Sequence, residues 1–146
     1  MNQDTDFNIV VKNDPYITRW QREYPHLLGD WIRFLPVGWY DLIDRLFGSI
    51  EAIEPRDPAE FAGSVSLSIR WYPGSAEASV TPHSMMDKWA PEQCQALIRA
   101  LRRFSIDTEN TCQVCGKPAV GILKYQDHRH QEVLCQTHMD ERRAAE

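Results

Sequence analysis

Residues 38–54, GWYDLIDRLFGSIEAIE, carry the clearest structural pattern in this sequence of 146 residues. Large apolar residues recur there at spacings of one, three and four, which places them on one face of a helix. They are Leu42, Ile43, Leu46, Phe47, Ile50 and Ile53. Asp41, Asp44 and Glu51 fall on the other faces. Because Pro55 follows and cannot continue a helix, the pattern predicts a helix over 38–54.

A strand and a second long helix are expected after this segment. Residues 64–72 alternate between polar and apolar side chains, which is typical of a half-buried strand. Pro73-Gly74 supplies a turn, and residues 77–81 are its expected antiparallel partner. Pro91 begins a helix whose apolar residues share one side. These are Cys94, Leu97, Ile98, Leu101 and Phe104.

The N-terminal segment predicts shorter elements. Residues 7–12 have the apolar content of a short strand, and Asp14-Pro15 is typical of a helix start, so a helix is expected over 15–24. A helical turn and a connector are expected over 26–37. Together, eleven residues are predicted to form most of the core. They are Trp39, Leu42, Ile43, Leu46, Phe47, Leu67, Ile69, Trp71, Leu97, Ile98 and Leu101.

The strongest chemical motif lies near the C-terminus. Cys112-Gln-Val-Cys115-Gly116 is followed by Cys135-Gln-Thr-His138. Two ligands separated by two residues can reach one ion from a tight turn, and two such pairs complete the closed Cys₃His shell of a structural zinc. Thiolates with one imidazole favour zinc over magnesium or calcium. The sequence therefore predicts one structural Zn²⁺, and unmetallated thiols are the alternative.

The fourth ligand has alternatives in the polar loop between the two pairs. His128 or His130 could replace His138, but the gap of two residues is repeated only with His138. Residues 119–125 and 132–134 predict two short strands, and residues from about 136 to 141 predict a helix. A knuckle, a hairpin and a helix with the last ligands describe a treble-clef or ribbon-like module. Cys94 is expected to be a small core residue.

The motifs of common enzymes are not found. The sequence has no Walker loop, GxGxxG, GxSxG or HExxH. A treble-clef nuclease using His128 and His130 is a weaker alternative, because it needs a second, open metal site on a helix that here carries a zinc ligand. We therefore expect a protein that is not an enzyme.

The acidic excess is confined to the first part of the chain. The net charge is −5, and residues 1–63 hold six basic and eleven acidic side chains. Such a surface repels nucleic acid and suits a basic protein partner, or serves solubility alone. Asp41, Asp44 and Glu51 are the candidate partner-binding residues.

Nucleic-acid binding is the alternative expectation. Arg99, Arg102 and Arg103 gather toward the end of the second long helix. There they are expected to favour the helix dipole, or to contact a phosphate group together with the zinc module. No apolar run approaches the ~18 residues of a membrane span, and the N-terminus lacks the pattern of a signal peptide. A cytoplasmic protein is expected.

The ordered combination of motifs resembles a group of small phage and prophage zinc-containing proteins. The residues that carry the resemblance are Gly38 to Leu46 (GWYDLIDRL), Leu67 to Tyr72 (LSIRWY), Cys112-x-x-Cys115-Gly116 and Leu134-Cys135-x-x-His138. It covers about residues 36–140, and the sequence departs from it at residues 61–64, where FAGS replaces a basic, glycine-containing lead. The group has no assigned reaction. The resemblance implies a phage-type accessory protein in a bacterial host cell. By analogy, it would bind, and inhibit, a host defence or nucleic-acid-handling complex.

The expected fold class is α+β. Residues 1–110 are predicted to form a helix-rich main domain with a small antiparallel sheet, and residues 111–146 a zinc-binding module. Because about 35 residues cannot bury a sufficient core, metal binding is expected to supply much of the folding free energy of the module.

Overall fold

The structure is a computed structural model that describes residues 14–54, 65–82, 89–126 and 130–145. The N-terminal elements are helical: α2 (Pro15–Glu23), the 3-10 helices η1 (Asp30–Phe34) and η2 (Val37–Trp39), and α3 (Tyr40–Ile53). The central elements are β1 (Val65–Tyr72), β2 (Ser75–Pro82) and α4 (Pro91–Glu109). The C-terminal elements are β3 (Gly121–Lys124), β4 (Gln131–Leu134) and α5 (Gln136–Ala144). The strand expected at residues 7–12 lies outside the described residues.

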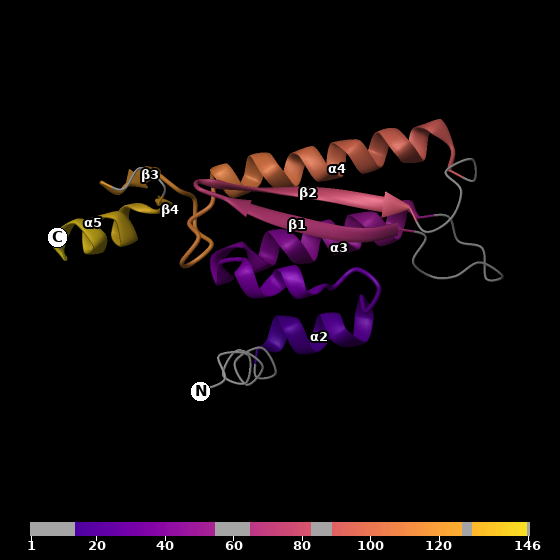
Figure 1. The fold of residues 1–146 in the computed structure, drawn as a ribbon, viewed down its shortest axis with the longest axis horizontal. Helices are drawn as coiled ribbons and strands as arrows, with labels where there is room; N and C mark the ends of the chain where they lie inside the picture. The colour runs from indigo at the N-terminus through magenta and orange to yellow at the C-terminus, as the bar shows by residue number, and fades with distance from the viewer. Residues whose placement is uncertain (1–13, 55–64, 83–88, 127–129, 146) are drawn as a thin grey trace.

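The described residues form an α+β fold, helix-rich with two small antiparallel sheets (Figure 1). In one sheet β1 pairs with β2, from Val65 opposite Pro82 to Tyr72 opposite Ser75. In the other β3 pairs with β4. The predicted partner strand over 77–81 is confirmed and is longer at both ends. No helix in the described part of the chain has the length and apolar character needed to cross a membrane.

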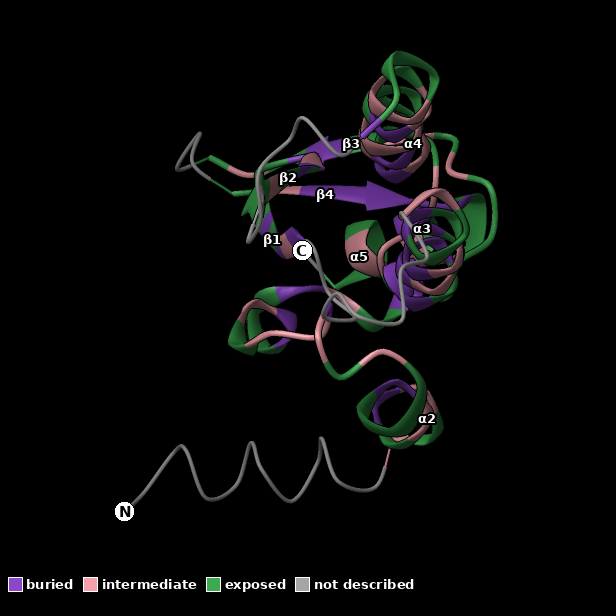
Figure 2. Cartoon of the chain, turned by 90° about the vertical axis from the view of Figure 1, so that its right-hand side faces the viewer, coloured by how far each residue is buried: buried purple, intermediate pink, exposed green. Residues whose placement is uncertain are grey.

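Helix α4 packs against both β2 and α3, and the apolar faces of the hairpin and of the two helices meet in one core. Figure 2 shows α4 with its outer side exposed and its inner side buried. The core contains several aromatic rings, and the Trp20 and Phe47 ring centroids lie 5.2 Å apart. Trp20, Trp39 and Phe47 are fully buried. The helix predicted over 38–54 is confirmed, with its first residues in a 3-10 turn.

Two residues predicted for the core are exposed. Trp71 is 39% exposed because it stands beside the hairpin turn, where the packed face of β1 ends. Ile98 is 49% exposed. It follows Leu97, which is buried, and a helix rotates by about 100° per residue, so Ile98 turns away from the core.

The C-terminal part is fastened to the start of α3 through backbone contacts. The Gly38 N–H donates to the Gln113 carbonyl oxygen at 2.9 Å, and the Trp39 indole N–H donates to the Thr111 carbonyl oxygen at 2.9 Å. A Cβ at Gly38 would lie 2.3 Å from the Cys112 carbonyl oxygen. Only glycine permits this approach, because both sides of the contact are main chain.

A second glycine, Gly74, lies in the β1–β2 turn where this turn contacts the C-terminal part. Gly74 has a φ of 89°, a conformation that glycine adopts without strain. A Cβ there would meet the side chains of Gln131 and Ile122 at 3.3 and 3.5 Å. Figure 1 shows β3, β4 and α5 beyond this turn, at one end of the molecule. The C-terminal part therefore contacts both α3 and the hairpin.

Gly38→Ala is expected to lower the free energy of unfolding by about 2–3 kcal/mol, because the new methyl group overpacks against rigid main chain. Gly48→Ala is the matched control within α3, because a Cβ there meets only the Tyr24 hydroxyl, at 3.8 Å. Replacing a helical glycine by alanine should stabilise the protein by about 0.5–1 kcal/mol. Chemical denaturation of both variants checks this, and equal stability of Gly38→Ala and wild type would contradict the packing described.

Candidate metal centre

Cys112 and Cys115 lie in a tight knuckle between α4 and β3. The Cys112 N–H donates to the Lys117 carbonyl oxygen at 2.8 Å, and the Gly116 N–H donates to the Cys112 carbonyl oxygen at 2.9 Å. Gly116 has a φ of 81°, which allows the chain to reverse directly after Cys115. The turn thus brings both sulfur atoms to the same side.

The second pair of side chains lies where β4 meets α5. Cys135 directly follows β4 and is the N-cap residue of α5. The Met139 N–H donates to the Cys135 carbonyl oxygen at 2.8 Å, which closes the first helical turn. His138 lies within that turn, so its ring projects back toward the end of β4.

The ligand atoms of Cys112, Cys115, Cys135 and His138 all lie within 4.8 Å of one another. The Cys115 and Cys135 sulfur atoms are 3.7 Å apart, and His138 Nδ1 lies 3.6 Å from Cys112 Sγ and 3.2 Å from Cys135 Sγ. Metal–sulfur bonds of about 2.3 Å in a tetrahedron put the sulfur atoms about 3.8 Å apart. The predicted Cys₃His group is therefore assembled with spacings that suit one tetrahedral metal ion.

The surroundings of the thiols favour a bound cation. The pKa of Cys135 is lowered to about 6, mainly by a hydrogen bond from the His138 backbone N–H. Burial raises the pKa of Cys112, but backbone hydrogen bonds from Cys135, Cys115 and Val114 outweigh it and the net shift is downward. At Cys115 the Lys117 backbone N–H favours the thiolate, yet burial and the neighbouring thiols leave its pKa raised. Three thiolates this close repel one another, and a metal ion removes that repulsion.

Two carboxylates support the group from outside it. Glu141 Oε2 lies 3.9 Å from His138 Nε2, the ring nitrogen that faces away from the thiols. This distance is longer than a hydrogen bond, so the carboxylate acts on the imidazole through its charge. Glu132 is buried on β4, accepts a hydrogen bond from the Tyr125 hydroxyl, and pairs with Arg142 at 3.2 Å, which holds α5 against the sheet. The sequence patterns did not predict a role for Glu141 or Glu132. The spacing of three residues between His138 and Glu141 is the signal that could have identified Glu141.

His130 and Cys94, which are also described, lie apart from this group. His130 is exposed, and its ring is 4.9 Å from the Tyr125 ring. His128, the other alternative ligand, lies outside the described residues. Cys94 is half-buried against the main core, as predicted, and is a free thiol. The structure brings His138 to the three thiols and leaves His130 outside.

The three acidic residues considered for partner binding differ in their surroundings. Asp44 accepts a hydrogen bond from the Trp20 indole at 2.9 Å and forms an ion pair with Arg19 at 2.6 Å, so it joins α2 to α3. Asp41 is exposed and pairs with Arg45 at 3.0 Å. Glu51 is exposed near the end of α3. Asp41 and Glu51 can meet a partner without loss of an internal contact between helices.

The arginine group lies farther from the helix end than expected. α4 continues to Glu109, and no basic residue is in its last turn, so the dipole explanation for Arg99, Arg102 and Arg103 is wrong. All three side chains are exposed. Arg103 pairs with Asp107 at 3.1 Å, whereas Arg99 and Arg102 form no ion pair within the described residues.

Cys135→Ser is expected to remove bound metal and to lower the melting temperature, because a serine hydroxyl is a poor replacement for a thiolate ligand. Cys94→Ser is the matched control and should keep the metal content of the wild type. Elemental mass spectrometry of the purified proteins, with thermal melts, checks both. Equal metal content in the two variants would contradict the assignment of ligands.

Comparisons with protein-family models, with curated proteins and with solved structures give no match.

Proposed function

We propose that the protein is a phage-type accessory protein that has a structural zinc, binds a host protein complex and is not an enzyme. The observation that carries the zinc part is the Cys₃His group with tetrahedral spacings. Three thiolates and one imidazole suit zinc better than harder cations. Four protein ligands fill the shell and leave no position for a reacting water, so the metal serves the fold.

The surrounding elements support a treble-clef arrangement of this zinc module. The knuckle at residues 112–116 supplies two ligands, and the β3–β4 hairpin follows it. The remaining ligands lie at the start of α5. A small second core of Cys112, Leu123, Leu134, Cys135 and Met139 surrounds the group. So few apolar side chains cannot stabilise the module alone, and we infer that zinc binding supplies the difference.

Removing the metal is expected to lower the melting temperature of the whole protein. The knuckle contacts Gly38 and Trp39, so the start of α3 loses its support when the knuckle unfolds. A thermal melt followed by near-ultraviolet circular dichroism, with and without a strong chelator, measures the loss through the packed aromatic side chains, which include the buried Trp20 and Trp39. Adding back Zn²⁺ should restore the melting temperature. An unchanged melting temperature after complete metal removal would argue against a structural role.

Exposed acidic groups on α3 support the binding part of the proposal. Asp41 and Glu51 are exposed on this helix, and the acidic excess of the chain lies in residues 1–63. A protein that ordinarily handles nucleic acid presents a basic surface, and an acidic surface of this kind can occupy it. The resemblance to small phage proteins supports a host complex as the partner. We infer that binding inhibits that complex.

Charge reversal tests the binding surface. Asp41→Lys/Glu51→Lys is expected to reduce capture of the partner from a bacterial lysate at least tenfold, because attraction becomes repulsion. Glu23→Lys/Asp140→Lys makes the same change of net charge at exposed sites on α2 and α5, and should capture as wild type does. Asp44 is left unchanged because its ion pair joins two helices. Equal capture by both double variants would overturn this surface.

A zinc-dependent regulator that binds nucleic acid is the second candidate. Arg99 and Arg102 favour it, because both are exposed without an ion-pair partner among the described residues. Binding to random-sequence DNA or RNA should then weaken steeply as salt is added. An electrophoretic shift lost in Arg99→Ala/Arg102→Ala would support this candidate, and no shift at low salt would remove it.

A further inference from the structure

The outer edge of β2 carries backbone groups that no neighbouring strand pairs. In an antiparallel pair, opposite residues either bond to each other or both point away. The Trp31 indole N–H donates to the Leu67 carbonyl oxygen at 2.9 Å, so the Leu67 backbone points away from β2. Leu67 lies opposite Val80, so the Val80 backbone points away from β1, and alternation gives Ala78 the same direction.

One position of this edge is already occupied. The Ala76 N–H donates to the Thr108 hydroxyl of α4 at 3.0 Å. The amide and carbonyl groups of Ala78 and Val80 have no hydrogen-bond partner among the residues that the structure describes. Unpaired edges of this kind are templates for a further strand.

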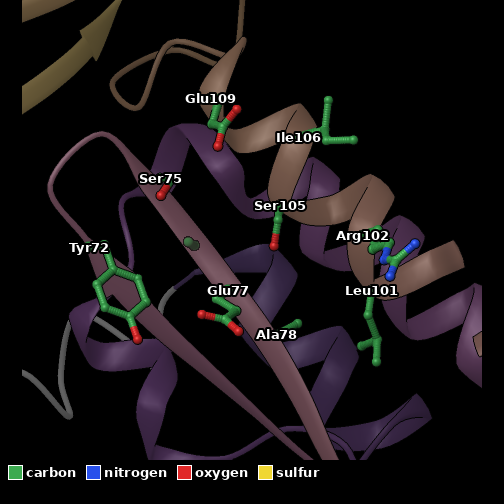
Figure 3. Close-up of a pocket in the computed structure, with 10 residues that line it drawn as sticks. Tyr72, Ser75, Glu77, Ala78, Leu101, Arg102, Ser105, Ile106 and Glu109 are labelled. Carbon is green, nitrogen blue, oxygen red and sulfur yellow. The ribbon is translucent and has the colours of Figure 1, made fainter. Parts of the chain in front are cut away.

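A groove of about 380 Å³ lies between one flank of α4 and residues 75–78 of β2, so it reaches the unpaired edge at Ala78 and ends before Val80. Figure 3 shows Ser105 and Glu109 of α4 directed toward β2, with Glu77 and Ala78 on the strand side. Leu101 and Ile106 give the groove an apolar wall, and the Ile106 side chain is 53% exposed. An exposed apolar wall beside an unpaired edge provides both the backbone bonds and the side-chain contacts that hold an added strand.

The charges of the groove are separated along its length. Glu109 and Glu77 lie near the hairpin turn and form no ion pair within the described residues. Arg102 precedes Glu109 by seven residues, which is about 10 Å along a helix. A bound segment therefore meets carboxylates at one end and a guanidinium farther along.

We propose that this groove binds an extended peptide segment of a partner protein, which adds as a strand to β2. Its backbone pairs with Ala78 and Val80, its apolar side chains lie against Leu101 and Ile106, and a basic side chain reaches Glu77 and Glu109. The inference rests on the proposed protein-binding function and names a second surface for it.

A second copy of this chain does not fit the edge. Strands that pair lie about 4.8 Å apart. Because α4 packs on β2 and bonds to its edge through Thr108, antiparallel two-fold pairing of two β2 strands would bring the two α4 helices about as close as the strands. Packed helices need 8–10 Å between their axes. A single extended segment avoids this collision.

The test selects binders from a phage-displayed library of random dodecapeptides against the full-length protein. We expect enriched peptides that alternate β-branched residues and carry Lys or Arg, with affinities measured by fluorescence anisotropy. Two N-methylated versions of one peptide are compared, one methylated at the odd and one at the even residues. Only one of these two sets of amides faces β2, so methylating that set should abolish binding and methylating the other should leave it unchanged.

Variants of the protein locate the binding surface. Ile106→Asp and Ala78→Pro are each expected to weaken peptide binding at least tenfold, and the first leaves the edge backbone intact. Val120→Asp is the matched control at another exposed apolar residue and should bind as wild type does. Glu77→Lys/Glu109→Lys should change the selected peptides from basic to acidic.

Three outcomes would overturn the groove: no enriched peptide, enriched peptides that bind Ile106→Asp as tightly as wild type, or a dimer in light scattering that Ile106→Asp abolishes. The capture experiment with wild type and Asp41→Lys/Glu51→Lys separates this failure from failure of the proposed function. If Ile106→Asp no longer binds peptides but still captures the partner from the lysate, the groove proposal fails and the proposed function stands. Absence of capture by wild type removes the proposed function, and with it this inference.

Discussion

The fold depends on one close approach of main chain to main chain, where the knuckle that carries Cys112 and Cys115 meets the start of α3. At Gly38 the two backbones are so near that a methyl group would lie 2.3 Å from the Cys112 carbonyl oxygen. The next residue, Trp39, is fully buried and bonds through its indole to Thr111. This contact holds together Cys112 of the Cys₃His group, a buried aromatic ring and the first turn of the central helix, so the group and the core do not vary independently.

Strand β4 also connects the Cys₃His group to the main core. Successive residues of a strand point to opposite faces. Val133 belongs to the main core, whereas Leu134 packs in the small core around the metal ligands. The Gln113 side chain, beside Cys112, accepts from the Val133 N–H at 3.0 Å. The boundary predicted after residue 110 remains a prediction, but the two cores share a strand and a hydrogen-bonded side chain.

Periodicity and ligand spacing predicted the elements and the metal group, because both depend on residues close in sequence. The stripe at Leu42, Ile43, Leu46 and Phe47 gave the correct buried face of α3, and the paired gaps of two residues gave the four side chains that the structure brings together. Contacts between distant segments could not be predicted this way. Nothing local in the sequence shows that Gly38 faces Gln113, that Asp44 is neutralised by Arg19, or that Trp71 stands beyond the packed face of its strand.

The bond between Trp39 and Thr111 spans 72 residues of sequence, and this has a consequence for the order in which the protein forms. Domains fold as they emerge during synthesis, N-terminal parts first. Here the start of α3 is made well before the backbone that packs on Gly38 and before the Val133 side chain that completes the core. The core therefore cannot be completed before β4 has been made, although α3 is already available.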